Sequence, residues 1–179
     1  MFRTLFLATA ASGALLACAS DADMGGDSTV SAMSADMTPE DRTNYVKMAA
    51  SSDMFEVQSS QLALSRAQNA DVRTFAQMMI DHHSQTTEQL RTAAKAAGLL
   101  RTHDWMLPPP MQRMMEELQA ASASDFDRLY MRQQVQAHEM ALALHSNYAR
   151  KGDTAALRVV ATAATPIVQR HLDRARELD

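Results

Sequence analysis

Apolar side chains recur at steps of three and four positions through most of the chain after residue 38, the spacing of one buried helix face. Four long stretches carry this pattern, with helix-breaking residues between them. The pattern predicts helices over about 38–67, 69–97, 126–151 and 154–179, and a shorter one over 111–120. No stretch alternates β-branched and polar residues as a strand would, so we expect an all-α fold.

Residues typical of helix ends stand at the boundaries of these stretches. Thr38, followed by a proline, is the expected N-cap of the first helix, Asn69 that of the second and Asp153 that of the last. Gly98 suits the position after the second helix because glycine adopts the left-handed conformation found there. Pro166 lies inside the last helix and predicts a kink.

One titratable residue interrupts the inward stripe of each long helix: Glu56, His83, His138 and His171. Glu56 and His83 stand at nearly equal separations from the first expected turn, at Asn69, so the two share a layer of an antiparallel hairpin. His138 and His171 are less evenly placed about the second turn, at Gly152, with an offset of ~7 Å along a helix, so the expectation is weaker for this pair. The stripes are Tyr45, Ala49, Ser52, Glu56 and Ala63; Ala76, Met79, His83, Thr86 and Leu90; Met131, Val135, His138, Leu142 and His145; and Leu157, Val160, Ala164, Ile167, His171, Ala175 and Leu178.

The composition of the 179 residues agrees with one helical domain plus tails. Hydrophobic residues make up 46% and charged residues 21%, with only 5 glycines and 5 prolines. The net charge of −4 offers no basic surface for nucleic acid. The 14 methionines would suit Cu(I), but they are spread at helical spacing, which is typical of core filling.

The N-terminus has the features of an export signal. Arg3 precedes an apolar stretch, residues 5–17, that is too short for a membrane-spanning helix and leads directly to Cys18, the only cysteine. The sequence Leu-Leu-Ala-Cys resembles the lipobox of bacterial lipoproteins, although a plain secretory signal is the alternative. By the same resemblance, Ala19 favours the outer membrane, so we expect a periplasmic protein held to that membrane by lipid chains. We therefore expect a signal peptide at 1–17, a lipidated cysteine with a flexible tether at 18–37 and a folded domain at 38–179.

Four blocks of the folded part resemble a ferritin-like domain family of unknown function from bacterial envelope proteins, often labelled putative outer membrane proteins. His83 matches the histidine of that family, and His82 stands where the family usually has Asp, a place that the adjacent Asp81 would have to fill. The resemblance implies a ferritin-like antiparallel four-helix bundle, with a short extra helix in the central crossover and a possible metal site. It covers roughly residues 40–178 and is carried by MFEVQSSQLAL (54–64), FAQMMIDHHSQTTEQL (75–90), FDRLYMRQQVQAHEMAL (126–142) and PIVQRHLDRA (166–175).

The donor types of the four inward residues suit one divalent ion such as Zn, Cu, Ni or Fe. Ferritin-like di-iron sites use two Glu-x-x-His motifs, and no glutamate of this chain has a histidine three positions later. The alternative is a buried Glu–His network that satisfies itself by hydrogen bonds and binds nothing. His82 and His145 then read as rim or satisfied histidines, and His103 as a surface residue of a loop.

Two functions remain open at this point. The first is a lipoprotein that binds a divalent transition metal through Glu56, His83, His138 and His171, with His82 and Asp81 as possible additions. The second is a non-catalytic envelope or stress-related interaction protein whose buried network is structural, with a protein partner that the sequence does not identify. Catalytic motifs are lacking, since no nucleophile elbow, phosphate-binding loop or His-Glu-x-x-His occurs, so an enzyme is the less favoured reading.

Overall fold

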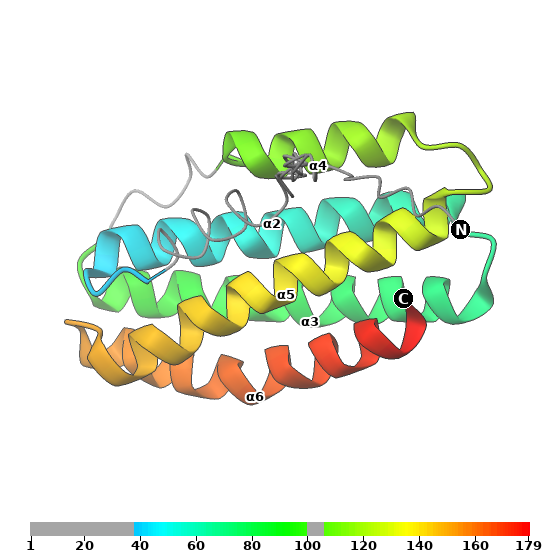
Figure 1. Cartoon of the computed structure of the whole chain (residues 1–179). Coiled ribbons are helices and arrows are strands. Elements are labelled where there is room, and N and C mark those ends of the chain that lie inside the picture. Colours follow the sequence, from blue (N-terminus) through cyan, green and yellow to red (C-terminus); the bar gives the residue numbers. More distant parts are fainter. Residues whose placement is uncertain (1–37, 100–105) are drawn as a thin grey trace, which may run out of the picture.

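The computed structural model describes residues 38–99 and 106–179, and all regular structure in these ranges is helical. Four long helices pack antiparallel, with a short helix between the second and third of them, which confirms the predicted fold class (Figure 1). The predictions at residues 1–37, the lipidation of Cys18 among them, and at His103 fall outside the described residues. The helices are α2 (Arg42–Arg66), α3 (Ala70–Ala96), α4 (Pro109–Ala120), α5 (Phe126–Lys151) and α6 (Ala155–Leu178).

The chain forms two helical hairpins joined by one long crossover. α2 pairs with α3 and α5 pairs with α6, while α2 also packs against α5 and α3 against α6. The short helix α4 carries the chain back along α2, so that α5 starts at the end of the bundle where α3 starts (Figure 1). Each long helix is therefore antiparallel to both of its neighbours.

Helix ends follow local chemistry, with some differences from the sequence prediction. α3 is capped by Asn69, whose Oδ1 accepts from the Asp71 N–H at 2.8 Å, as predicted. The helix ends at Ala96, and Gly98 shortly beyond it has a φ of 78°, in the left-handed region, as predicted. The expected cap Thr38 is wrong, because α2 begins later and its N-cap is Asp41.

The last helix also differs at its start and confirms its interior proline. The expected cap Asp153 is wrong, because the N-cap position of α6 is Thr154. Asp153 instead accepts from the Tyr148 hydroxyl at 2.8 Å. Pro166 lies within the continuous helix α6, which bends about midway along its length in Figure 1, as expected for an interior proline.

The bundle interior has two apolar ends and a polar middle. One end is packed around Tyr45, Leu144, Tyr148 and Leu157, and the other around Phe75, Met79, Phe126 and Tyr130. Between them lies a buried polar layer to which all four long helices contribute: Asp53, Glu56, Ser59, Ser60, His83, Gln134, His138 and His171. No described helix contains a stretch long and apolar enough to cross a membrane.

Candidate metal centre

Three of the four predicted residues meet at the centre of the polar layer. His83 from α3, His138 from α5 and His171 from α6 each offer a ring nitrogen, and these atoms lie within 4.8 Å of one another. The ring centroids are 5.4–5.7 Å apart. All three side chains are buried, with exposures of 5%, 0% and 3%. The weaker half of the sequence argument, the pairing of His138 with His171, is thus confirmed as a spatial cluster.

Measuring from the true helix ends explains why the second pair meets. α5 ends at Lys151 and α6 starts only at Ala155, so the turn between them is longer than a single glycine. In each hairpin, one residue of the pair precedes the end of the first helix and the other follows the start of the second helix. The separation along the second helix is slightly the longer in both hairpins. This offset is the same for His138 and His171 as for Glu56 and His83. Placing the second turn at Gly152 alone had therefore overstated the mismatch.

Each histidine of the trio has one ring nitrogen engaged and the other without a partner. His83 Nδ1 lies 2.7 Å from Asp53 Oδ1, and His138 Nδ1 lies 2.8 Å from the backbone carbonyl oxygen of Gln134. His171 Nε2 lies 2.8 Å from His82 Nδ1. The remaining atoms, His83 Nε2, His138 Nε2 and His171 Nδ1, are buried without a hydrogen-bond partner.

These contacts determine where the lone pairs lie. A carbonyl oxygen only accepts, so His138 Nδ1 carries the proton and Nε2 presents a lone pair. Asp53 acts in the same way on His83, because a carboxylate accepts the Nδ1 proton. His171 presents a lone pair from Nδ1 when its Nε2 donates to His82. Engagement of the outer nitrogen by a carboxylate or carbonyl is the usual arrangement around metal-binding histidines.

Glu56 lies beside the trio rather than within it. Its Oε1 is 3.7 Å from His138 Nδ1, the nitrogen already bonded to Gln134, and its Oε2 is buried without a partner. Burial raises the pKa of Glu56 to about 7, against the opposing effect of nearby His83. A divalent cation near Glu56 would favour the carboxylate form.

The surroundings of the three histidines shift their pKa values in different directions. Burial, with a smaller effect of the neighbouring histidines in the same direction, lowers the pKa of His138 to about 3 and that of His171 to about 2. Burial opposes a charge on His83 as well, but the Asp53 hydrogen bond and the nearby carboxylates raise its pKa above the ordinary value. At neutral pH, His138 and His171 are therefore neutral imidazoles, the form that binds metals.

Asp53 is the residue of the centre that the sequence argument missed. It is 6% exposed and also accepts from the hydroxyls of Thr86, at 3.0 and 3.1 Å, and Thr87, at 3.2 Å. Its position, three places before Glu56 on the same helix face, was the available signal.

The other predicted histidines and Asp81 have different places. His145 is buried and satisfied, with Nδ1 3.1 Å from the Tyr45 hydroxyl. His82 is exposed, and its Nδ1 lies 2.8 Å from the outer nitrogen of His171. Asp81 is exposed and accepts from the Gln77 amide, away from the trio.

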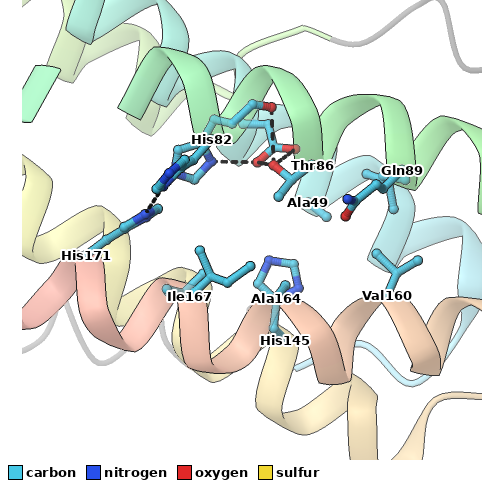
Figure 2. A pocket seen from close by; sticks show the side chains of 13 residues that line it. Ala49, His82, Thr86, Gln89, His145, Val160, Ala164, Ile167 and His171 are labelled. Carbon is cyan, nitrogen blue, oxygen red and sulfur yellow. Dashed lines mark hydrogen bonds and ion pairs between the residues drawn. The ribbon is translucent and has the colours of Figure 1, made fainter. Parts of the chain in front are cut away.

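A small cavity of about 20 Å³ lies between α3 and α6 and reaches the trio. Figure 2 shows His82 and His171 together at one end of this cavity, Gln89 and Val160 at the other, and His145 in its wall. A space of this size holds roughly one water molecule. The cavity is lined both by exposed His82 and Gln89 and by two members of the trio, His83 and His171.

The fold and the cluster define a helical bundle with a buried three-histidine group that could hold a metal ion. The chain belongs to the family described as a domain of unknown function (DUF4142), whose model matches residues 27–178. Comparisons with curated proteins and with solved structures found no significant match. Membership brings no reaction or ligand with it, so the function rests on the geometry of the site.

Proposed function

We propose that this domain binds one divalent transition-metal ion through His83, His138 and His171. The observation that carries the proposal is the convergence of three buried ring nitrogens, none with a hydrogen-bond partner. Metal binding displaces any proton on His83 Nε2, and three neighbouring lone pairs in a low-dielectric interior then favour a positive centre between them. Donors of a tetrahedral zinc site lie roughly 3.3 Å apart, so the side chains would close in slightly around the ion.

Two buried carboxylates supply the charge that such an ion requires. Asp53 holds His83 at 2.7 Å, and Glu56 has one oxygen without a partner. Together the two carboxylates can balance two positive charges when Glu56 is ionised. Glu56 is also the available carboxylate for a fourth ligand to the ion. A nitrogen-rich set with one carboxylate fits Zn, Cu, Ni or Fe better than Mg or Ca.

The purely structural alternative is less well supported by the same contacts. A self-satisfied network needs the inner nitrogens bonded to one another or to Glu56, and none of these bonds is present in the described part of the chain. Buried polar atoms without partners are uncommon in native proteins and call for an explanation. An ion among the three nitrogens would provide one.

Metal content tests the proposal directly. The protein is produced with its own export signal and purified without chelator or affinity tag, and its metals are measured by inductively coupled plasma mass spectrometry. We expect about one equivalent of a transition metal in the wild type, loss of it in a His83→Ala/His138→Ala double variant, and retention in His145→Ala. His145→Ala is the matched control because it also removes a buried histidine from α5.

Two outcomes would decide against the metal. A folded wild type that carries no metal and gains none from added Zn²⁺, Co²⁺, Ni²⁺, Cu²⁺ or Fe²⁺ contradicts the proposal, circular dichroism providing the check on folding. Equal occupancy in the double variant would place the ion elsewhere. In either case a non-catalytic interaction protein with a structural polar layer becomes the better description.

The cellular setting is also part of the proposal. An exported lipoprotein joined to the outer membrane at Cys18 would place the bundle in the periplasm, supported by the lipobox-like sequence. A ferritin-like classification is supported by the single long crossover through α4, which is the connection typical of that architecture. Metabolic labelling with a tagged fatty acid tests the anchor, and Cys18→Ala should abolish the label.

A further inference from the structure

His82 is an exposed imidazole at the rim of the buried cluster. Its Nδ1 lies 2.8 Å from His171 Nε2, and the two rings are nearly parallel, with 17° between their planes and 5.0 Å between their centroids. No other hydrogen bond to the His82 ring occurs among the described residues. His82 therefore combines an exposed imidazole ring with direct contact to a residue of the trio.

The trio itself is poorly accessible to an ion from solution. Its members are at most 5% exposed, and the adjoining cavity of about 20 Å³ is too small for a cation with its full hydration shell. An arriving ion must therefore exchange water for protein ligands before it reaches the interior. His82 and His171 lie together at one end of the cavity in Figure 2, and His83 also lines the cavity.

We propose that His82 is the capture ligand of this site, the residue that binds the ion first and passes it to His171. The inference rests on the proposed function. Transfer exchanges one imidazole for another on the same ion, and no electron is exchanged. When the His82–His171 hydrogen bond breaks, the Nδ1 lone pair of His82 becomes free to bind the ion, while each ring keeps its own Nε2 proton. A turn of the His171 ring then presents its Nδ1 lone pair to the ion and delivers it to His83 and His138. In this scheme His82 sets the rates of loading and release, while the three buried histidines set the affinity.

The test measures Co²⁺ uptake by stopped-flow absorbance in the full-length protein. The variant is His82→Asn, because an asparagine amide can accept the hydrogen bond from His171 but is a much weaker ligand than imidazole. His82→Gln serves as a second variant with the same chemistry. Gln89→Asn is the matched control, since it changes an exposed side chain of α3 that lines the same cavity.

We expect uptake by His82→Asn to be at least about tenfold slower, because loading then has to await a larger opening of the bundle. Release to excess chelator should slow by a similar factor, leaving Kd nearly unchanged, and Gln89→Asn should match the wild type. Uptake and release at wild-type rates in both His82 variants would overturn the inference and leave the metal site intact. Faster release with unchanged uptake would also overturn it, and would make His82 a positioning residue for His171. Failure of the wild type to bind Co²⁺ or any other divalent metal would overturn both proposals.

Discussion

Replacing Asp53 by asparagine tests whether this carboxylate tunes the centre. Asp53 is 6% exposed and accepts from the ring nitrogen of His83, at 2.7 Å, and from two threonine hydroxyls. Asp53→Asn keeps the size of the side chain and one acceptor oxygen, so the position of the His83 ring should survive. What it removes is the negative charge that would make His83 a better metal ligand and would offset the charge of a bound ion.

The expected magnitude follows from the kind of contact that is lost. Loss of a partner beyond the direct ligands usually weakens metal binding by about 10–100-fold, or about 1.4–2.7 kcal/mol. The protein without metal should be destabilised by a smaller amount, about 1 kcal/mol, because one charged hydrogen bond becomes a neutral one. The free energy of metal binding should therefore change by more than the free energy of unfolding.

Competition with a chromophoric chelator at pH 7.5 measures the affinity, and urea unfolding measures the stability. Asp127→Asn is the matched control: Asp127 accepts from the backbone N–H groups of Gln68 and Asn69, at 2.7–3.1 Å, on an exposed part of the surface. It should lower stability and leave Kd unchanged. Equal metal affinity in Asp53→Asn and wild type would refute the assignment of Asp53 to the centre.

Three further predictions concern the bundle around the site. Burial lowers the pKa of His145 to about 4, whereas the pKa of this residue in the unfolded chain is near 6.5, so the unfolded chain binds more protons between these two values. The free energy of unfolding should therefore fall as the pH falls through this window, by roughly 3 kcal/mol from this residue between pH 8 and pH 4. Urea unfolding at several pH values should show a shallower pH dependence in His145→Gln than in the wild type. Gly152→Ala should lower the free energy of unfolding by about 1–3 kcal/mol, because the added Cβ would overlap the Tyr148 ring, and an unchanged urea midpoint would contradict this. Arg66 donates to three backbone carbonyls at and just beyond the end of α4, at 2.5–2.9 Å. Arg66→Lys should lower the free energy of unfolding by about 2 kcal/mol, because lysine lacks the planar fork of the guanidinium group. A wild-type melting temperature of this variant in calorimetry would exclude that role.

The sequence carried most of the architecture because helix periodicity and capping residues are local signals. Asn69 and Gly98 mark the ends of α3 correctly, since each acts within its own helix turn. Asp41 was passed over in favour of Thr38 because both residue types cap well, and only the contacts of the folded chain select between them. Local sequence signals therefore predicted the helices themselves more accurately than the residue at which each helix begins.

The site was predictable in its residues and less so in its connections. Stripe positions identified His83, His138 and His171, because a buried face repeats along its helix. The role of Asp53 depends on its distance to a side chain of another helix, which its spacing from Glu56 within α2 does not determine by itself. The pairing of His82 with His171 has the same origin, since the two residues are far apart in the sequence.

The arrangement of the hairpins gives the cluster a place in the folding of the chain. Each hairpin joins helices that are close in sequence, whereas the trio needs His83 from one hairpin and His138 and His171 from the other. Contacts between distant segments generally form late, because they close the longest loops. A chain with both hairpins formed but undocked has no complete cluster. An ion retained there would therefore report that the two hairpins have docked.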